Sequence, residues 1–148
     1  MDLDHVYMAE ALAEARLGAS EGGIPIGSVL VIDGRIVGRG HNRRIQQGSA
    51  ILHGEMDALE NAGRLPASDY ARSTLYSTLS PCPMCAGASL LFKIPRVVFA
   101  ENRTFVGAED WLARKGVELR NLDLREAREM MLRFIAEHPD VWNEDIAV

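Results

Sequence analysis

The sequence predicts an α/β protein: one three-layer α/β/α domain, spanning residues 1–148, around a five-stranded mixed sheet. A hairpin signal near the N-terminus predicts that the first two strands are antiparallel. Farther along the chain, strand and helix patterns alternate, which predicts parallel pairing with helices on the sheet faces. A chain of 148 residues has the size of one domain and buries roughly 68–70% of the surface that its unfolded form exposes, enough for a substantial core.

The first helix is predicted over residues 4–20. Met8, Leu12 and Ala15 recur there at helical spacing and form an apolar stripe. Gly22-Gly23 follows this stripe, and glycines commonly occur just past the end of a helix. The segment therefore predicts one amphipathic helix that ends before residue 22.

An antiparallel hairpin is predicted next. Residues 26–32 are apolar and β-branched, as expected for a buried strand, and residues 35–40 form a second strand pattern. Asp33-Gly34 lies between them, and this dipeptide favours the tight turn of a two-residue hairpin loop.

The remaining segments alternate between helix and strand patterns. Pro83 is tolerated because it lies in the first turn of its helix, while Gly63 and His138-Pro139 are helix-ending signals. We therefore predict a helix at residues 54–62, a strand at 74–79, a helix at 83–92, strands at 96–100 and 117–122, and a helix at 125–137.

Two segments outside these elements carry large aromatic residues. Residues 101–115 form a long connection that contains Phe105 and Trp111, and long connections in compact domains are often functional. The tail at residues 139–148 contains Trp142, and a frayed terminus rarely carries tryptophan. We predict that both segments are walls of a site.

The charge balance argues against a long nucleic acid as the partner. The chain has 16 basic and 21 acidic residues and a formal net charge of −5, whereas a polynucleotide binder usually presents a basic face to the phosphates. The densest basic stretch, residues 39–44, is typical of a solvated strand end. The sequence shows no secretory signal pattern and no apolar run of membrane-spanning length, so we expect a cytoplasmic protein with no membrane partner.

Two short motifs carry the chemistry. His53-Gly54-Glu55 opens one predicted helix, and Pro81-Cys82-Pro83-Met84-Cys85 opens another. One imidazole and two thiolates bind zinc well, and a catalytic zinc site leaves its fourth position to water. Bound zinc lowers the pKa of water from 15.7 toward roughly 7. Glu55 is then placed to move protons between this water and a substrate.

Each motif alone has other interpretations. The two cysteines could form a thioredoxin-like redox pair or half of a structural metal site. Redox chemistry, however, would leave His53 and Glu55 without a role. A structural zinc site normally has four protein ligands, and the chain has no third cysteine. A fourth ligand could in principle come from another histidine, but each of these lies outside a ligand-like pattern: His5, His41 and His138.

The joint pattern resembles the signature of the zinc nucleobase deaminases, His-x-Glu followed by Pro-Cys-x-x-Cys. The whole chain resembles the fungal type of cytosine deaminase, within the cytidine deaminase-like zinc deaminase superfamily. It departs from that type at Met56-Asp57-Ala58 and at residues 104–108. The blocks that carry the resemblance are Glu21-Gly22-Gly23-Ile24-Pro25-Ile26-Gly27, Gly38-Arg39-Gly40-His41-Asn42, Leu52-His53-Gly54-Glu55, Leu79-Ser80-Pro81-Cys82 and Trp142-Asn143-Glu144-Asp145-Ile146.

This resemblance implies a cytidine-deaminase-like fold, a homodimer and the conversion of free cytosine to uracil with release of ammonia, a reaction of pyrimidine salvage. It implies one Zn²⁺ per chain, with a bound water or hydroxide, held by His53, Cys82 and Cys85, and proton transfer by Glu55. The implied substrate-binding residues are Asn42, Gly54 through its N–H, Ser80 through its carbonyl, Asp145 and, packed against the ring, Ile26, Phe105 and Trp142.

The residues themselves leave several alternatives open. Guanine, isocytosine or another amino-substituted heterocycle could replace cytosine as the substrate. A tRNA adenosine deaminase shares both motifs but should present a basic face. A zinc-binding module without turnover would have no use for Glu55. Without the resemblance, Asn42 is typical of a turn and Asp145 of a solvated tail, and large apolar side chains are typical of a core or lid.

Overall fold

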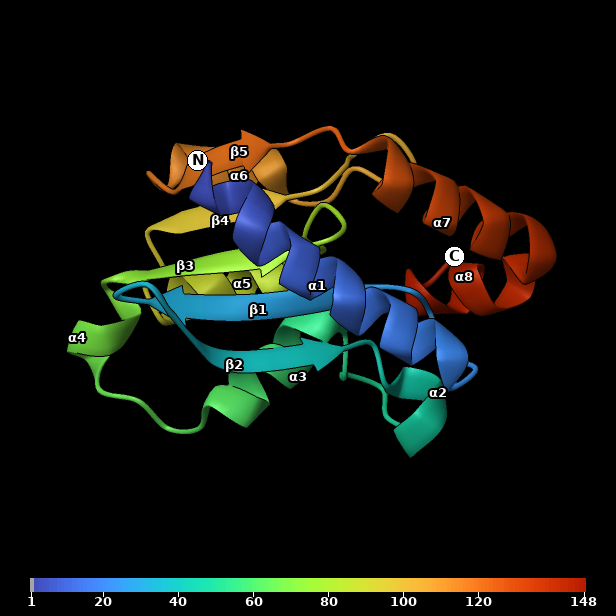
Figure 1. Ribbon diagram of the computed structural model, residues 1–148, viewed down its shortest axis with the longest axis horizontal. Coiled ribbons are helices and arrows are strands. Elements are labelled where there is room, and N and C mark those ends of the chain that lie inside the picture. The colour runs from blue at the N-terminus through green and yellow to red at the C-terminus, as the bar shows by residue number, and fades with distance from the viewer. Residues whose placement is uncertain (1) are drawn as a thin grey trace.

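The computed structural model describes residues 2–148 and contains one five-stranded mixed sheet (Figure 1). Its strands are β1 (Gly27–Ile32), β2 (Arg35–His41), β3 (Ser73–Ser77), β4 (Arg96–Phe99) and β5 (Glu118–Asn121). The strand order is β2-β1-β3-β4-β5. β1 pairs antiparallel with β2, which confirms the predicted hairpin, and also antiparallel with β3, while β3, β4 and β5 are parallel.

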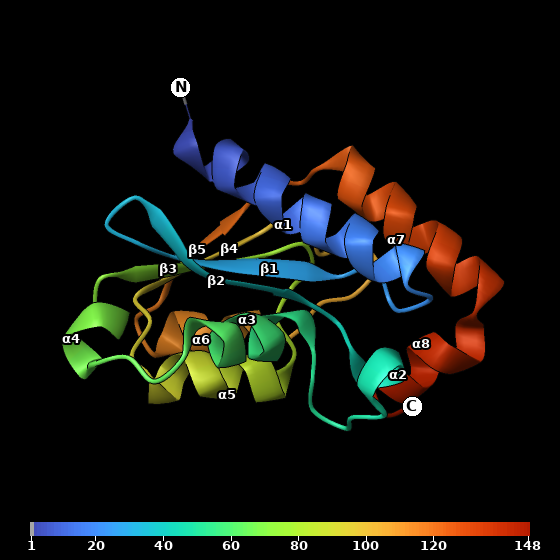
Figure 2. The same cartoon turned by 60° about the horizontal axis from the view of Figure 1, so that its bottom comes forward.

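Helices cover both faces of this sheet, which confirms the three-layer arrangement (Figure 2). The helices are α1 (Leu3–Ser20), α2 (Arg44–Gln47), α3 (Gly54–Ala62), α4 (Ala67–Tyr70), α5 (Pro83–Leu91), α6 (Glu109–Arg114), α7 (Arg125–Glu137) and α8 (Pro139–Asp145). One face carries α1 and α7, and the other carries α3, α5 and α6. Within residues 2–148, no helix is long and apolar enough to cross a membrane.

The central strand β1 is buried along its whole length because both faces of the sheet are covered. Successive side chains of a strand point to opposite faces. Val29 and Val31 therefore pack with Met8 of α1, whereas Leu30 packs with Leu59 of α3 on the other side. A third apolar cluster contains Ile24, Ile26, Leu79, Met131 and Trp142.

Two glycines of β2 let α3 approach the sheet closely. A Cβ atom at Gly38 would lie 2.3 Å from the Ala58 carbonyl oxygen, and one at Gly40 would lie 2.6 Å from the Ala58 nitrogen. Any side chain at these positions would push α3 away from the strand. The glycines thus fix the position of α3, and with it the residues at its N-terminal end.

Every predicted helix and strand is present, and the ends differ from the predicted ones by at most two residues. Two segments predicted to be irregular contain helices: α6 lies within residues 101–115, and the tail forms α8. Such helices span two turns or fewer, too short to show an apolar stripe. Trp142 is 5% exposed, which confirms that the tail is an ordered part of the fold.

Asp4, near the start of α1, lies in a cluster of charges that ties the helix to the sheet. Its carboxylate accepts two hydrogen bonds of 2.7 Å from Arg96 on β4. It also accepts one of 2.6 Å from each of Arg120 on β5 and Tyr76 on β3. The bonds from the Arg96 guanidinium above all hold the pKa of Asp4 well below its ordinary value.

Substituting Asp4→Asn should lower the free energy of unfolding at pH 7 by about 2–4 kcal/mol, because Arg96 loses its buried counter-ion. A carboxyl whose pKa is depressed by folding stabilises the fold above its unfolded pKa, about 3.9, and loses this contribution as the pH falls toward the folded pKa. In urea titrations, the difference between the two proteins should therefore shrink below about pH 4.

Asp33→Asn is the matched control, since the ion pair of Asp33 with Arg72 is largely exposed. It should change the free energy of unfolding by less than about 1 kcal/mol. A difference between wild type and Asp4→Asn that stays constant from neutral to acid pH would contradict the ionic role of Asp4.

Candidate active site and metal centre

Two helices that begin at the same end of the sheet bring the sequence motifs together. His53 immediately precedes α3, and Cys82 immediately precedes α5, with Cys85 in the first turn of that helix. The Cys82 sulfur accepts a hydrogen bond of 3.5 Å from the Cys85 N–H and so caps α5. The partial positive charge at a helix N-terminus favours thiolates at these positions.

His53, Cys82 and Cys85 form a compact cluster of metal-binding atoms. His53 Nδ1 lies 3.3 Å from the Cys82 sulfur and 3.7 Å from the Cys85 sulfur. Tetrahedral zinc, with bonds of ~2.1 Å to nitrogen and ~2.3 Å to sulfur, holds such atoms roughly 3.6 Å apart. In the part of the chain that the structure describes, this cluster has three members. The donor set fits one zinc ion with a fourth position for water.

A small cavity lies against this cluster. Its free space is small, and its lining combines residues of the metal-binding cluster with apolar side chains. The rings of Phe105 and Trp142 meet edge to face in its wall, with centroids 5.9 Å apart. The predicted site residues found in the lining are Ile26, His53, Glu55, Ser80, Cys82, Phe105, Trp142 and Asp145.

Comparison with known proteins identifies the family. Residues 1–101 match the family model of the cytidine and deoxycytidylate deaminase zinc-binding region. The chain belongs to this family. A cytosine deaminase from Candida albicans is 56% identical over 137 residues, which are 92% of this chain and 91% of that protein.

Other relatives of this deaminase are named as tRNA deaminases. The tRNA-specific adenosine deaminase of Bacillus subtilis is 45% identical over 100 residues, which are 67% of this chain and 62% of that protein. A solved structure from a study of A-to-I editing by tRNA:A34 deaminases has a TM-score of 0.71 and 29% identity, and the match covers 85% of this chain and 99% of the other. The cytidine-deaminase-like fold is thereby confirmed, and the chain is a zinc-dependent hydrolytic deaminase.

Glu55 of the deaminase lies in a position where its carboxyl can exchange protons near neutral pH. The residue is 4% exposed, and burial, followed by the charge of Cys82, raises the pKa of Glu55 to about 7. A general acid–base group works best when its pKa lies close to the working pH. The electrostatics of the site therefore suit the proton transfer expected of this residue.

Without a metal, hydrogen bonds among the three residues of the metal-binding cluster shift their pKa values. Hydrogen bonds from Cys85 and His53 lower the pKa of Cys82 to about 4. The bond to Cys82, followed by burial, raises the pKa of Cys85. Burial opposes the charge of His53, but hydrogen bonds to Asp145 and Cys82 outweigh it and raise the pKa of His53 to about 10. Zinc binding must therefore displace protons from His53 and Cys85.

Asp145 faces the outer nitrogen of His53. Its Oδ2 atom lies 3.4 Å from His53 Nε2, an arrangement by which carboxylates orient metal-binding histidines. Its Oδ1 atom accepts a hydrogen bond of 3.1 Å from Asn42 Nδ2. Asn42 is fully buried and is not in the cavity lining itself, but it contacts Asp145, which is. The structure thus brings together two predicted residues, Asn42 and Asp145, that lie 103 residues apart in the chain.

Other predicted residues lie beside the cavity or away from it. Cys85 is fully buried behind the lining. A Cβ at Gly54 would lie 3.1 Å from the Ile26 carbonyl oxygen, so this glycine allows α3 to start close to β1. Trp111, expected in a wall of the site, instead lies near Gly87 of α5 and is 36% exposed, because α6 turns it away.

Several functional contacts were missed from sequence. Leu79 and Ile146 line the cavity. The sequence signal that could have identified them is that they are the neighbours of Ser80 and Asp145 in the chain. Glu101 is fully buried and accepts N–H bonds from the loop that leads to Phe105. The Ser80 hydroxyl donates to Glu109 over 2.6 Å and accepts from the Gly107 N–H over 2.9 Å. The carboxylates thus shape the loop that carries Phe105.

Proposed function

We propose that this deaminase hydrolyses free cytosine to uracil with release of ammonia, and that residues 1–148 act as one catalytic domain with one zinc ion. The observation that carries the proposal is a small cavity walled by Phe105 and Trp142 that borders both Glu55 and the metal-binding cluster. The 56% identity to a cytosine deaminase supports cytosine as the base.

The chemistry follows from the residues around the cavity. His53, Cys82 and Cys85 would hold the zinc ion, which supplies the Lewis acidity that makes water a nucleophile at neutral pH. Glu55 accepts a proton from the attacking water, passes it to the ring nitrogen, and then moves the second proton to the departing amine. One water is consumed and one ammonia leaves, so Glu55 ends each cycle in its starting state.

Polar groups from four segments would hold the pyrimidine ring. A side-chain amide has two N–H donors, and Asn42 uses one of them on Asp145, so the other can bond the ring carbonyl. Asp145 would accept a hydrogen bond from the base. The remaining contacts are the Gly54 N–H, the Ser80 carbonyl and the apolar faces of Ile26, Phe105 and Trp142.

Ammonia release from a panel of substrates tests this function. We expect release from cytosine to exceed release from cytidine, guanine, isocytosine and a tRNA anticodon stem by at least about 100-fold, since buried polar groups reject a ligand that leaves them unpaired. The net charge of −5 and the small cavity favour a free base over RNA. Release from cytidine but not from cytosine would overturn the substrate, and full activity after complete zinc removal would overturn the mechanism.

We also propose a homodimer in the cytoplasm. In the apolar helix α5 only Cys85, Ala86 and Ser89 are buried, and Leu91 at its end is 73% exposed. Partly exposed apolar side chains along one helix favour burial against another protein surface. The two free thiols suit a reducing compartment. Light scattering should therefore report twice the 16.3 kDa of one chain, whereas a monomer would contradict the assembly.

A further inference from the structure

Arg44 of α2 joins the segment before His53 to the C-terminal helix. Its Nε donates to the Ala50 carbonyl oxygen over 2.9 Å. Its two Nη atoms bind the two oxygens of Glu144, over 2.5 and 2.8 Å, and Nη1 also donates to Asp145 Oδ1 over 3.3 Å. One guanidinium therefore holds the backbone of the first segment and two carboxylates of α8.

The setting of these bonds makes them specific. The Arg44 side chain is 13% exposed and the Asp145 side chain is 2% exposed, so salt and water screen their attraction only weakly. A planar guanidinium that binds a carboxylate through two parallel N–H bonds fixes direction as well as distance. Figure 2 shows α2 beside α8, although the bonded residues Arg44 and Glu144 are 100 residues apart in the chain.

Few other polar contacts hold α8. Among the described residues, its side chains form hydrogen bonds or ion pairs with Arg44, Asn42 and His53. Because Arg44 and Asn42 occupy Oδ1 of Asp145, the second oxygen, Oδ2, is directed toward His53 Nε2. A series of direct contacts thus runs from Arg44 through Asp145 to a residue of the metal-binding cluster.

We propose that Arg44 is a positioning residue: it locks α8 in place so that Asp145 orients His53 for zinc and α8 closes the cavity. The proposal rests on the proposed zinc site, but it does not depend on cytosine being the substrate. We call the bonds from Arg44 to Glu144 and Asp145 the clamp. Because the Glu144 side chain is 66% exposed, substituting this residue should weaken the clamp less than substituting Arg44.

The test compares Arg44→Gln with wild type by hydrogen exchange and by the rate of zinc transfer to a chelator, without substrate. We expect amide exchange in residues 139–145 to become at least about tenfold faster while exchange in α1 stays unchanged. Zinc release should become about 10–100-fold faster, the usual effect of losing a group that orients a metal ligand. Arg44→Lys keeps the positive charge but cannot form the two parallel N–H bonds of a guanidinium. Its rates of amide exchange in α8 and of zinc release should therefore lie between those of wild type and Arg44→Gln.

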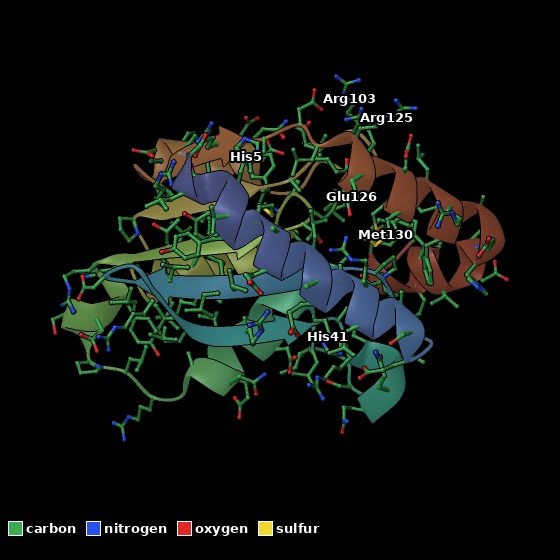
Figure 3. All side chains as sticks on the ribbon, in the orientation of Figure 1. His5, His41, Arg103, Arg125, Glu126 and Met130 are labelled. Carbon is green, nitrogen blue, oxygen red and sulfur yellow. The ribbon has the colours of Figure 1, made fainter. Side chains whose placement is uncertain are left out.

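Arg16→Gln is the matched control because it breaks another ion pair between helices, whose two residues do not line the cavity. Arg16 on α1 binds Glu126, which is labelled on α7 in Figure 3. Equal exchange and equal zinc release in the two arginine variants would overturn the proposal, as would faster exchange throughout Arg44→Gln. If that variant fails to fold, Glu144→Gln must show the faster exchange in α8 for the proposal to hold. A wild type that binds no zinc would overturn the proposed function, while exchange in α8 would still test the clamp.

Discussion

Substituting Glu55→Gln should lower the turnover of cytosine by about 10²–10⁴-fold, the usual contribution of a general acid–base group, while zinc stays bound. Glutamine has nearly the same shape as glutamate, but its neutral amide cannot take a proton from water or return one to the leaving amine. The zinc content should not change, because Glu55 does not belong to the cluster of His53, Cys82 and Cys85. Ammonia release and elemental analysis of the same sample measure both quantities.

Glu60→Gln on the exposed face of the same helix is the matched control and should keep the wild-type rate. Turnover within a factor of ten of wild type in Glu55→Gln would refute the assignment of the proton carrier. Loss of zinc together with turnover would mean instead that this residue supports the metal.

The stability of the metal-free protein gives a second readout of Glu55. Burial raises the pKa of this carboxyl to about 7, so its charged form is disfavoured in the fold. The sign is opposite to that of Asp4: Glu55 destabilises the fold as the pH rises above its unfolded pKa, about 4.3, and the penalty reaches its full value above the folded pKa. Metal-free Glu55→Gln should therefore be more stable than metal-free wild type at pH 8, and this advantage should vanish in acid.

The sequence was most informative where a feature depends on neighbours in the chain. The helix over residues 54–62 was predicted with the correct ends because its period and Gly63 are local signals. The metal-binding cluster was predicted because each motif begins a helix, and helix starts on one sheet edge converge. The contacts of His41, in contrast, depend on the tertiary fold: its ring lies against α1 (Figure 3), between Glu14 at 2.9 Å and Glu21 at 2.8 Å.

The contacts around Asp145 could not be predicted from sequence spacing. Asp145 meets Asn42 and Arg44 across about 100 residues of chain, and no spacing rule links such positions. The resemblance pointed to Asp145 and Asn42, but it did not predict that they bond each other or that Arg44 binds two carboxylates of α8, those of Glu144 and Asp145. Contacts of this kind depend on where α8 packs, which is set by Trp142 and the apolar cluster around it.

Substituting Cys85→Ala should remove zinc and with it all measurable deamination. Cys85 is one of the three residues of the cluster that would hold zinc, and it is fully buried, so the substitution would leave only two of these ligands. A ligand that binds only the folded state stabilises it, by about 2.7 kcal/mol at 100 times its dissociation constant. A chelator should therefore lower the melting temperature of wild type and leave that of Cys85→Ala unchanged. Met84→Ala, between the two cysteines, should retain zinc.

The protons released by zinc test the same ligand set without mutation. At pH 7, the metal-free chain holds Cys82 as thiolate, since its pKa is about 4, whereas His53, with a pKa of about 10, and Cys85, with a raised pKa, are protonated. Binding of one zinc should therefore release about two protons, and zinc affinity should rise as the pH increases from 7 because fewer protons then compete for His53 and Cys85. Calorimetry in buffers of different ionisation enthalpy counts these protons. Binding without proton release would mean that zinc is held by other groups, since His53 and Cys85 can bind it only after they lose their protons.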